Sequence, residues 1–587
     1  MLVCISSVEL ATCTSKPVGT RPAVGAEPQV KMVVGRGGNV TVALPSVPVQ
    51  LNPWAPGGDT QATFMIMSLV WPSAFWVTPQ LQSSSDEAFI TSAELVKLDP
   101  QTVVYKIAPN AVWSDGVPIS ASDFIYAWQA HVGLLTQASG KPVQSVPVAG
   151  YGDIASVSGS DGGSKVTVVF KSPFADWESL FSYLVPAGPT ERYGWARGYS
   201  HFDAATQISG GPMVVTAFQP GKKVVLSRNP RWWGTPCTLS RITVVPAGSS
   251  DQLAGAMGSG AVQLAETFPS QGLMDDLSSK PNLSSLVAQG TTLVQLDFNV
   301  ASGPAEDPRV RQAIADLLDR NAVLESVVGN IDPQETVATN FIFASGESGY
   351  EQGGQAYQSS HPKTGLRLLA DAGYTLRGGR VIGATGQPLV IRMLVDAADP
   401  WAAPVASTVQ SELSTVGVQV AVDTLPEPVF DSALVPGGAW DMAVVRVPTG
   451  PYPSQVALRY LPTGSSIPGS AGSGSQGPAN AAPAYRNDMG FDDPLVTSLI
   501  ASAESELNAN MSQLIWQQDQ KAQRERHDHV NNYKDICEHP SSLLETVCTI
   551  AEIAIAMLST RLASWQSSRY QLSCACPNHL PSEPATA

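Results

Sequence analysis

The side chains of this chain with the greatest capacity for chemistry are its histidines and cysteines, and they gather toward one end. Four of the seven histidines and four of the seven cysteines lie after residue 526. His527 and His529, and likewise Cys574 and Cys576, stand two positions apart, as two ligands of one metal ion can. No further pair stands at a spacing typical of zinc sites, so we predict no metal site and no cofactor.

Motifs of the common enzyme classes are missing from the sequence. It contains no Gly-x-Ser-x-Gly, no Walker A loop and no His-Glu-x-x-His. The remaining histidines, His131, His201 and His361, stand far apart, and each is better explained as a surface or hydrogen-bonded residue than as a catalytic base. We therefore predict that the protein is not an enzyme.

One cysteine near the start has a different role available to it. The run Leu-Ala-Thr-Cys13 resembles a lipobox, at which a bacterial lipoprotein carries its lipid, and residues 14–38 would then be a flexible tether. The basic and apolar parts of a signal peptide are missing before it, and Glu9 lies where an apolar residue is expected. Residues 1–38 are therefore a truncated signal with its tether, or an ordinary N-terminal segment.

Charge and composition exclude two classes of protein. The 587 residues hold 34 Lys and Arg against 50 Asp and Glu, a net charge of -16. A nucleic-acid binder depends on basic side chains for its affinity, so this class is excluded. Hydrophobic residues make up 43%, enough for a large core, which excludes general disorder. No apolar stretch reaches the roughly 20 residues that a membrane span requires.

Hydrophobic patterns alternate along the chain between those of strands and those of helices. This order predicts βαβ units and an α/β architecture. We predict helices that begin near Ser120 and over residues 309–320, 365–372 and 403–416. We predict strands over residues 39–44, 103–107, 165–170, 223–230, 294–299, 389–395 and 418–422.

Four segments, in order along the chain, resemble one family. The first runs from Trp113-Ser-Asp-Gly-Val-Pro to Tyr126-Ala-Trp, and the second reads Arg-Asn-Pro-Arg-Trp-Trp-Gly234. The third joins Phe-Asn299 to Asp-Pro-Arg-Val-Arg-Gln-Ala313, and the fourth begins Phe491-Asp-Asp-Pro. Together they are similar to the family 5 extracellular solute-binding proteins, the binding components of ABC importers for peptides and nickel, over residues 39–510.

The resemblance implies the two-lobed periplasmic-binding-protein fold of type II, in which two α/β lobes close on a ligand. Lobe I would comprise residues 39–328, including a subdomain at 79–164. Lobe II would be residues 329–483, with a low-complexity loop at 461–484, and residues 485–511 would return to lobe I. Residues 512–587 form an atypical tail that does not follow the family.

A function follows from the resemblance. The protein would be an exported, lipid-tethered component of the cell envelope that binds a peptide-like or other small solute and delivers it to a membrane permease. An alternative comes from residues 68–75, which are similar to a mycobacterial lipoprotein of the same family that is associated with mannolipid synthesis. In that case the protein regulates glycolipid biosynthesis through protein contacts.

The ligand site is the part of the resemblance that departs from the family. Peptide-binding members hold the ligand's amino terminus with an acidic residue just after the strand that here ends near Val445. In this chain the next residues include Arg446 and Tyr452 but no carboxylate, so the resemblance implies an anionic group instead. The candidate ligand-binding residues are Asn299, Arg446, Tyr452, Trp71, Phe75 and Trp76.

Each candidate has a structural alternative. Asn299 is equally suited to capping a turn, the three aromatic residues to packing in a core, and Arg446 to a surface ion pair. The resemblance also places Arg309, Arg311 and Arg320 in the scaffold, paired with carboxylates. For the tail, we hypothesise a non-homologous origin such as a frameshifted reading frame, which would leave lobe I without its final strand.

Overall fold

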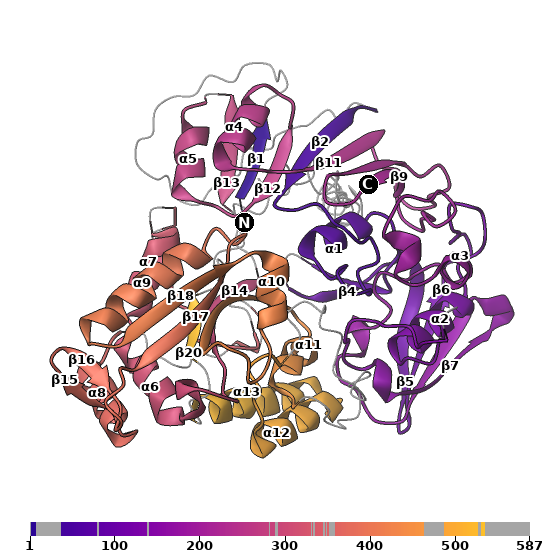
Figure 1. The fold of residues 1–587 in the computed structure, drawn as a ribbon. Helices are drawn as coiled ribbons and strands as arrows, with labels where there is room; N and C mark the ends of the chain where they lie inside the picture. The colour runs from indigo at the N-terminus through magenta and orange to yellow at the C-terminus, as the bar shows by residue number, and fades with distance from the viewer. Residues whose placement is uncertain are drawn as a thin grey trace, which may run out of the picture.

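The structure is a computed structural model with two lobes, each built on its own β-sheet (Figure 1). It describes residues 2–6, 37–78, 81–137, 140–280, 282–287, 291–329, 331–332, 335–343, 347, 349–350, 359–462, 487–525 and 530–533. Cys13 and the His527/His529 and Cys574/Cys576 pairs lie outside these residues. Among the described helices, none is both long enough and apolar enough to cross a membrane.

Lobe I is organised around a seven-stranded sheet in the order β13-β1-β12-β2-β11-β10-β9. Its central strand, β2, is parallel to β11 and β12. Helices α4 and α5 cover one face of the sheet, where Leu253, Met257 and Leu277 pack with Ala43 of β2. The elements are β1 (Leu2–Ser6), β2 (Asn39–Leu44), α1 (Gln61–Met67), β9 (Met213–Gln219), β10 (Lys223–Arg228), β11 (Arg241–Pro246), α4 (Ser250–Gly258), β12 (Leu264–Thr267), α5 (Gln271–Ser278) and β13 (Leu283–Val287).

The first residues differ from the sequence prediction. In the structure Leu2–Ser6 forms β1, which pairs with both β12 and β13 of the lobe I sheet. Without β1 the facing edges of β12 and β13 would be left without their backbone partners.

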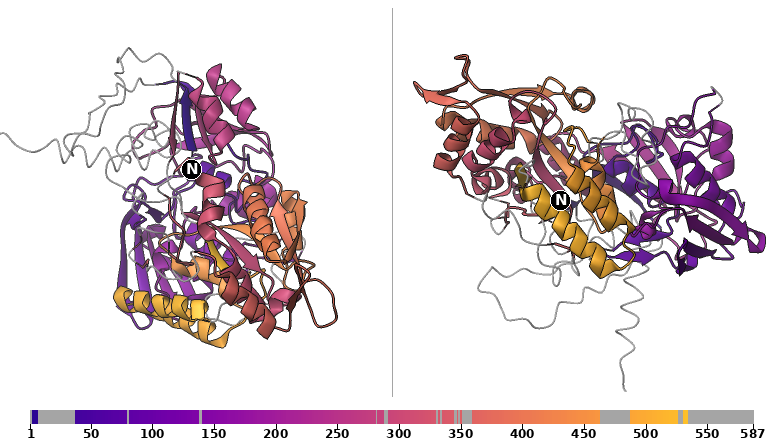
Figure 2. Two further views of the ribbon diagram at one scale, coloured as in Figure 1. Left: turned by 90° about the vertical axis from the view of Figure 1, so that its left-hand side faces the viewer. Right: turned by 90° about the horizontal axis from the view of Figure 1, so that it is seen from below.

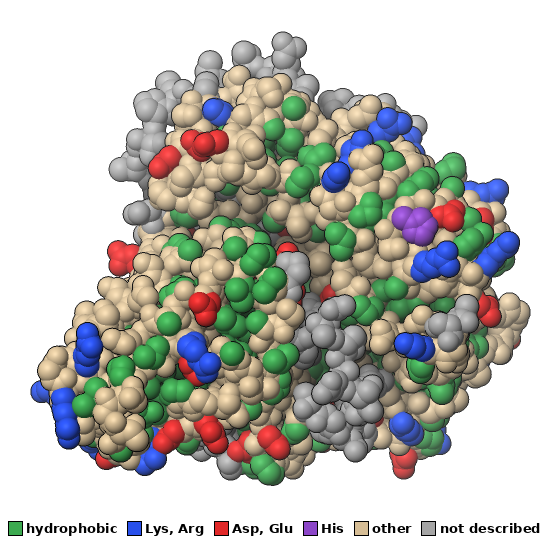
Figure 3. Space-filling model, viewed as in Figure 1, with side chains coloured by type: hydrophobic (Ala, Val, Ile, Leu, Met, Phe, Trp, Pro, Cys, Tyr) green, Lys and Arg blue, Asp and Glu red, His purple; other side chains and the backbone are tan. Residues whose placement is uncertain are grey.

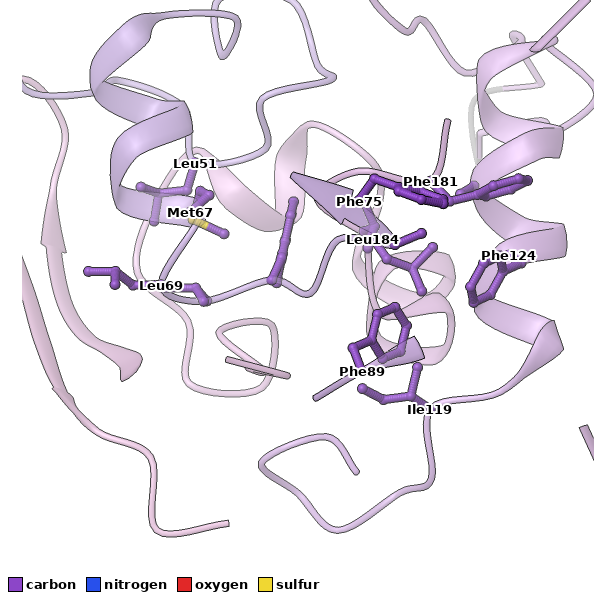
Figure 4. Close-up of a cluster of buried hydrophobic side chains, with 14 of the residues drawn as sticks. Leu51, Met67, Leu69, Phe75, Phe89, Ile119, Phe124, Phe181 and Leu184 are labelled. Carbon is purple, nitrogen blue, oxygen red and sulfur yellow. The ribbon is translucent and has the colours of Figure 1, made fainter. Parts of the chain in front are cut away.

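The subdomain of lobe I carries a four-stranded sheet in the order β5-β6-β8-β7. Its helix α2 begins where the Asp123 carboxylate accepts hydrogen bonds from the backbone N–H groups of Ser120 (3.0 Å) and Ala187 (2.9 Å). Figure 4 shows the shared core, in which Phe124 and Phe181 lie near Phe89 and Phe75. The elements are β3 (Phe75–Val77), β4 (Ser83–Ser85), β5 (Ile90–Leu98), β6 (Gln101–Ile107), α2 (Ala121–His131), β7 (Ile154–Ser160), β8 (Lys165–Phe170) and α3 (Ala187–Tyr193).

Lobe II has a five-stranded sheet in the order β18-β17-β19-β14-β20. β17 is parallel to β18 and β19, and β14 is antiparallel to β19. A separate two-stranded sheet is formed by β15 (Thr375–Arg377) and β16 (Arg380–Ile382). The strands of the five-stranded sheet are β14 (Thr292–Phe298), β17 (Val390–Asp396), β18 (Gln419–Leu425), β19 (Met442–Pro448) and β20 (Val530–Tyr533). The helices are α6 (Pro308–Leu317), α7 (Arg320–Val328), α8 (Pro362–Asp371), α9 (Ala402–Thr415), α10 (Glu427–Ala433), α11 (Pro453–Ala457), α12 (Pro494–Ser505) and α13 (Ala509–Glu525).

The boundary between the lobes lies earlier than residue 328. β14 pairs with β19 along its whole length, from Thr292 opposite Pro448 to Phe298 opposite Met442. Side chains of β14, α6 and α7 share one core with β17 and α9. The family-like segment from Phe298 to Arg320 is therefore part of lobe II, because its apolar residues are buried against that sheet.

The C-terminal helices also belong to lobe II, and not to lobe I as the sequence predicts. Ile500 of α12 and Trp516 of α13 are buried in one cluster with Trp440. The pair lies along the junction of the lobes when the molecule is seen from below (Figure 2, right). One backbone bond, from Ala175 N–H to Glu504 O at 2.6 Å, joins α12 to lobe I. Residues 512–520 of the predicted tail are thus folded into the protein.

Candidate ligand-binding site

The carboxyl ends of the parallel strands identify where a ligand would bind. In open α/β sheets ligands bind beyond these ends. Phe268 follows β12 directly at this edge of lobe I, and Arg446 lies near the end of β19 at the corresponding edge of lobe II. The two side chains are in contact, with the guanidinium carbon of Arg446 4.2 Å from the Phe268 ring centroid. On the face drawn in Figure 3, charged side chains lie mostly toward the rim.

Arg446 is fixed by partners from both lobes. Its Nε donates to Asp399 Oδ2 at 2.9 Å. The ring of Trp401 meets Phe268 edge-on at 5.1 Å, and Trp401 Nε1 donates to Pro269 O at 2.9 Å. The predicted ion pair of Arg446 is present, but it is part of a contact between the lobes.

Two further carboxylates surround this guanidinium. Asp396 ends β17 and Glu427 begins α10. Burial raises the pKa of both carboxyl groups, as do the neighbouring carboxylates, while Arg446 lowers it. Asp396, Asp399 and Glu427 thus place three carboxyl groups beside one guanidinium. Asp399 already pairs with Arg446 in the structure, and the expectation that this side chain favours an anion stays a prediction.

Tyr452 lies in a second contact between the lobes. It directly precedes α11, and its hydroxyl donates to Ser83 Oγ at 2.9 Å, with Glu178 O at 3.4 Å. Burial raises the pKa of this phenol. Its hydroxyl therefore has partners in lobe I, and a role in binding solute stays a prediction.

Buried carboxyl groups accompany this second contact. Burial raises the pKa of Asp153 to about 7 and that of Asp176 to about 6, and it raises the pKa of Glu504 well above its ordinary value. Asp176 Oδ2 accepts from the backbone N–H of Ser454 at 3.0 Å. The contact is thus sensitive to protonation.

Asn299 does not join Arg446. It follows β14 and lies beside Asp441, at the end of the sheet where β19 begins. Five residues of extended chain separate positions 441 and 446, roughly 17 Å. Its Nδ2 donates to Trp440 O (3.1 Å) and Gly438 O (3.2 Å), and its Oδ1 accepts from Gly437 N–H (3.1 Å). The turn-capping alternative describes these contacts.

The three aromatic candidates differ in how far their side chains are buried. Trp71 is 1% exposed and its Nε1 donates to Ile208 O. Phe75 is 6% exposed and packs edge-on against Trp177 at 5.4 Å. Both are core residues, as their alternative stated. Trp76 is half-buried, so it alone of the three retains an accessible surface.

The arginines of the family-like segment hold local structure. Arg309 forms an ion pair with Asp307 at 2.6 Å, as predicted. Arg311 donates to the carbonyl oxygens of Ala305 (2.7 Å) and Glu306 (3.0 Å). These contacts confirm a scaffold role for both side chains.

Sequence reasoning missed most of the residues around Arg446. They share one signal, since each lies at the end of a strand or a few residues after it, at the carboxyl edge of its sheet. A search limited to these positions would have found Phe268, Asp396, Asp399, Trp401 and Glu427. Among the described residues, no group of three or more His, Cys, Asp or Glu side chains is placed to hold a metal ion.

This fold is that of the two-lobed solute-binding proteins. Residues 87–468 match the bacterial extracellular solute-binding proteins, family 5, and the chain belongs to this family. Proteins of the family bind solutes outside the cytoplasm and are not enzymes.

Particular relatives include two mycobacterial proteins. The chain is 27% identical over 469 residues to the probable monoacyl phosphatidylinositol tetramannoside-binding protein LpqW of Mycobacterium tuberculosis, which covers 74% of this chain and 72% of LpqW. It is 28% identical over 446 residues to the oligopeptide-binding protein OppA of the same species, covering 74% and 73% of the two chains.

Solved structures confirm the two-lobed type II fold. The periplasmic EDTA-binding protein EppA superposes with a TM-score of 0.73 at 23% identity, covering 87% of this chain and 93% of EppA. The oligopeptide-binding protein AppA from Bacillus subtilis, in complex with a nonapeptide, superposes with a TM-score of 0.69 at 15% identity, covering 85% and 94%.

Proposed function

We propose that this protein binds a small, peptide-like solute between its lobes and delivers it to the permease of an ABC importer at the cell envelope. The observation that carries the proposal is the meeting of the two carboxyl edges at Phe268 and Arg446. The match to OppA and the likeness to the peptide complex of AppA support a peptide-like solute. They also favour solute binding over regulation through protein contacts.

The charges of the site favour a solute with a positive group. Asp396 and Glu427 lie beside Arg446 and come from two elements other than β19. They supply the negative charge that the sequence lacks just after β19. A peptide's ammonium group placed here would be attracted by both carboxylates, and an uncharged group would not.

Peptides with and without the ammonium charge test this proposal. Trialanine should raise the melting temperature of the full chain, since a ligand at 100 times its Kd stabilises the native state by about 2.7 kcal/mol. N-acetyl-trialanine, which lacks the charge, should give a smaller shift. In the D396N/E427Q variant the two peptides should shift melting equally.

A matched control is the D423N/E94Q variant, which removes two exposed carboxylates elsewhere on the described surface. It should keep the discrimination of the native chain. If no member of a di-, tri- and tetrapeptide panel changes the melting temperature, the proposed function is wrong. Native mass spectrometry of the protein from its own host would then show what it carries.

A further inference from the structure

Phe268 is held rigidly on lobe I but contacts lobe II. Only Phe268, Pro269 and Ser270 separate the last residue of β12 from the first of α5. Ser270 caps the helix, accepting from the backbone N–H of Leu273 at 3.3 Å. Because a residue before proline is confined to extended conformations, Phe268 has little backbone freedom. Its ring packs against the core cluster of lobe II.

The Phe268 ring belongs to a closed circuit of contacts with Arg446, Asp399 and Trp401. Arg446 covers the ring at 4.2 Å and donates from Nε to Asp399 Oδ2. Asp399 Oδ1 in turn accepts from the backbone N–H of Trp401 at 2.9 Å. Trp401 returns to lobe I through its edge-on contact with Phe268 and its bond to Pro269 O. Each residue is thus oriented by the next. The contacts that Arg446 and Trp401 make with Phe268 cross between the lobes, as does the Trp401 bond to Pro269 O.

The circuit leaves part of Arg446 available. Its side chain is 28% exposed, and its ion pair with Asp399 engages Nε. Within the described residues, the Arg446 ion pair and its contact with Phe268 leave the terminal Nη groups without a hydrogen-bond partner. A guanidinium in this position can donate to a carbonyl or carboxylate oxygen.

We propose that Phe268 is a positioning residue: its ring holds the Arg446 guanidinium at the carboxyl edge of lobe II, so that contact between the lobes and presentation of the Nη groups to a solute oxygen occur together. This inference rests on the proposed function for its solute. The contact between the lobes is independent of any solute.

Variants at position 268 separate positioning from packing. F268L retains an apolar side chain but has no aromatic face for the cation, and F268Y retains the face. Titration of the full chain with trialanine should show affinity reduced roughly fivefold in F268L and restored in F268Y. F202L, which alters an exposed phenylalanine of lobe I, is the matched control and should bind as the native chain does.

A double-mutant cycle with R446Q gives a readout that packing alone would not move. If the ring acts through the guanidinium, F268L should change affinity less than about twofold in the R446Q background. Native affinity in F268L, or an equal loss in both backgrounds, overturns the inference.

Small-angle X-ray scattering without peptide measures whether Phe268 holds the two lobes together. F268L should then have a larger radius of gyration than the native chain and F202L, because one link between the lobes is lost. If the native chain binds no peptide, the proposed function fails, and a larger radius in F268L still supports Phe268 as a link between the lobes. An unchanged radius overturns this inference as well.

Discussion

Asp176 of lobe I and Ser454 of lobe II are joined by a hydrogen bond, from the Ser454 backbone N–H to Asp176 Oδ2 at 3.0 Å. The Asp176 carboxyl group is buried close to Glu504, and Glu504 is close to Asp153. Lys171 is the cation that faces Asp153, and Glu178, Tyr105 and Tyr452 complete the titratable groups of the contact. Carboxyl groups thus outnumber cations where α11 and α12 meet lobe I.

The free energy of unfolding should fall as the pH rises through the pKa values of these buried carboxyl groups. The pKa values of Asp153 and Asp176 in the folded protein are raised to about 7 and about 6, by burial first of all. Such groups bind protons more tightly when folded, so their stabilisation is full below a pH of about 4 and is lost as pH rises through 6 and 7. We expect the unfolding free energy of D153N, relative to that of the native chain, to rise by about 1 to 3 kcal/mol between pH 5 and pH 8.

Urea denaturation at the two pH values measures this difference. E94Q, at an exposed position of β5, is the control and should differ little from the native chain at either pH. A D153N variant that is less stable than the native chain at pH 8 would show that the Asp153 carboxylate is stabilising when ionised.

Tyr452 should act through Ser83. Loss of its hydroxyl in Y452F removes the 2.9 Å bond to Ser83 Oγ and should cost about 1 kcal/mol of stability. S83A removes the same bond from the other lobe. The double variant should therefore lose clearly less than the sum of the two single variants, as measured by urea denaturation. Strictly additive losses would place the two hydroxyls in separate interactions.

Local patterns predicted the elements well because these patterns depend on neighbouring residues. The alternation in residues 39–44 and 165–170 corresponds to β2 and β8 with the same bounds, and the helix predicted near Ser120 is α2. The lobe to which β14 belongs was not predictable in this way. Its apolar run would suit either sheet, and its partner β19 lies about 150 residues further along the chain.

The site was only partly predictable for the same reason. Arg446 was found because the family resemblance marks the end of β19. Its partners Phe268, Asp399 and Trp401 carry no local motif, and they come together through the packing of two lobes. The charge around Arg446 depends on side chains from other strands and helices, which the residues of one strand cannot predict.

The part of the predicted tail that forms α13 should be needed for the stability of the fold. Trp516 is 2% exposed, within the cluster that contains Trp440 and Ile500. We expect W516A to cost about 3 to 5 kcal/mol. Deletion of residues 512–587 should lower the melting temperature strongly, since it removes this tryptophan. Deletion of residues 534–587 is the control, because it keeps every contact described for α13, and an equal effect of both deletions would contradict the prediction.

Asn299 should affect stability without affecting solute binding. Its side-chain amide is buried and bonded to the backbone of Gly437, Gly438 and Trp440, at the end of β19 remote from Arg446. N299A leaves these backbone groups without their partner, which should cost about 2 to 4 kcal/mol in urea denaturation. Its affinity for trialanine, measured under conditions where the variant is folded, should equal that of the native chain. R446Q should differ from N299A in binding, because folded R446Q should bind trialanine more weakly than the native chain does. If folded N299A binds trialanine more weakly than the native chain does, Asn299 takes part in solute binding and this prediction is wrong.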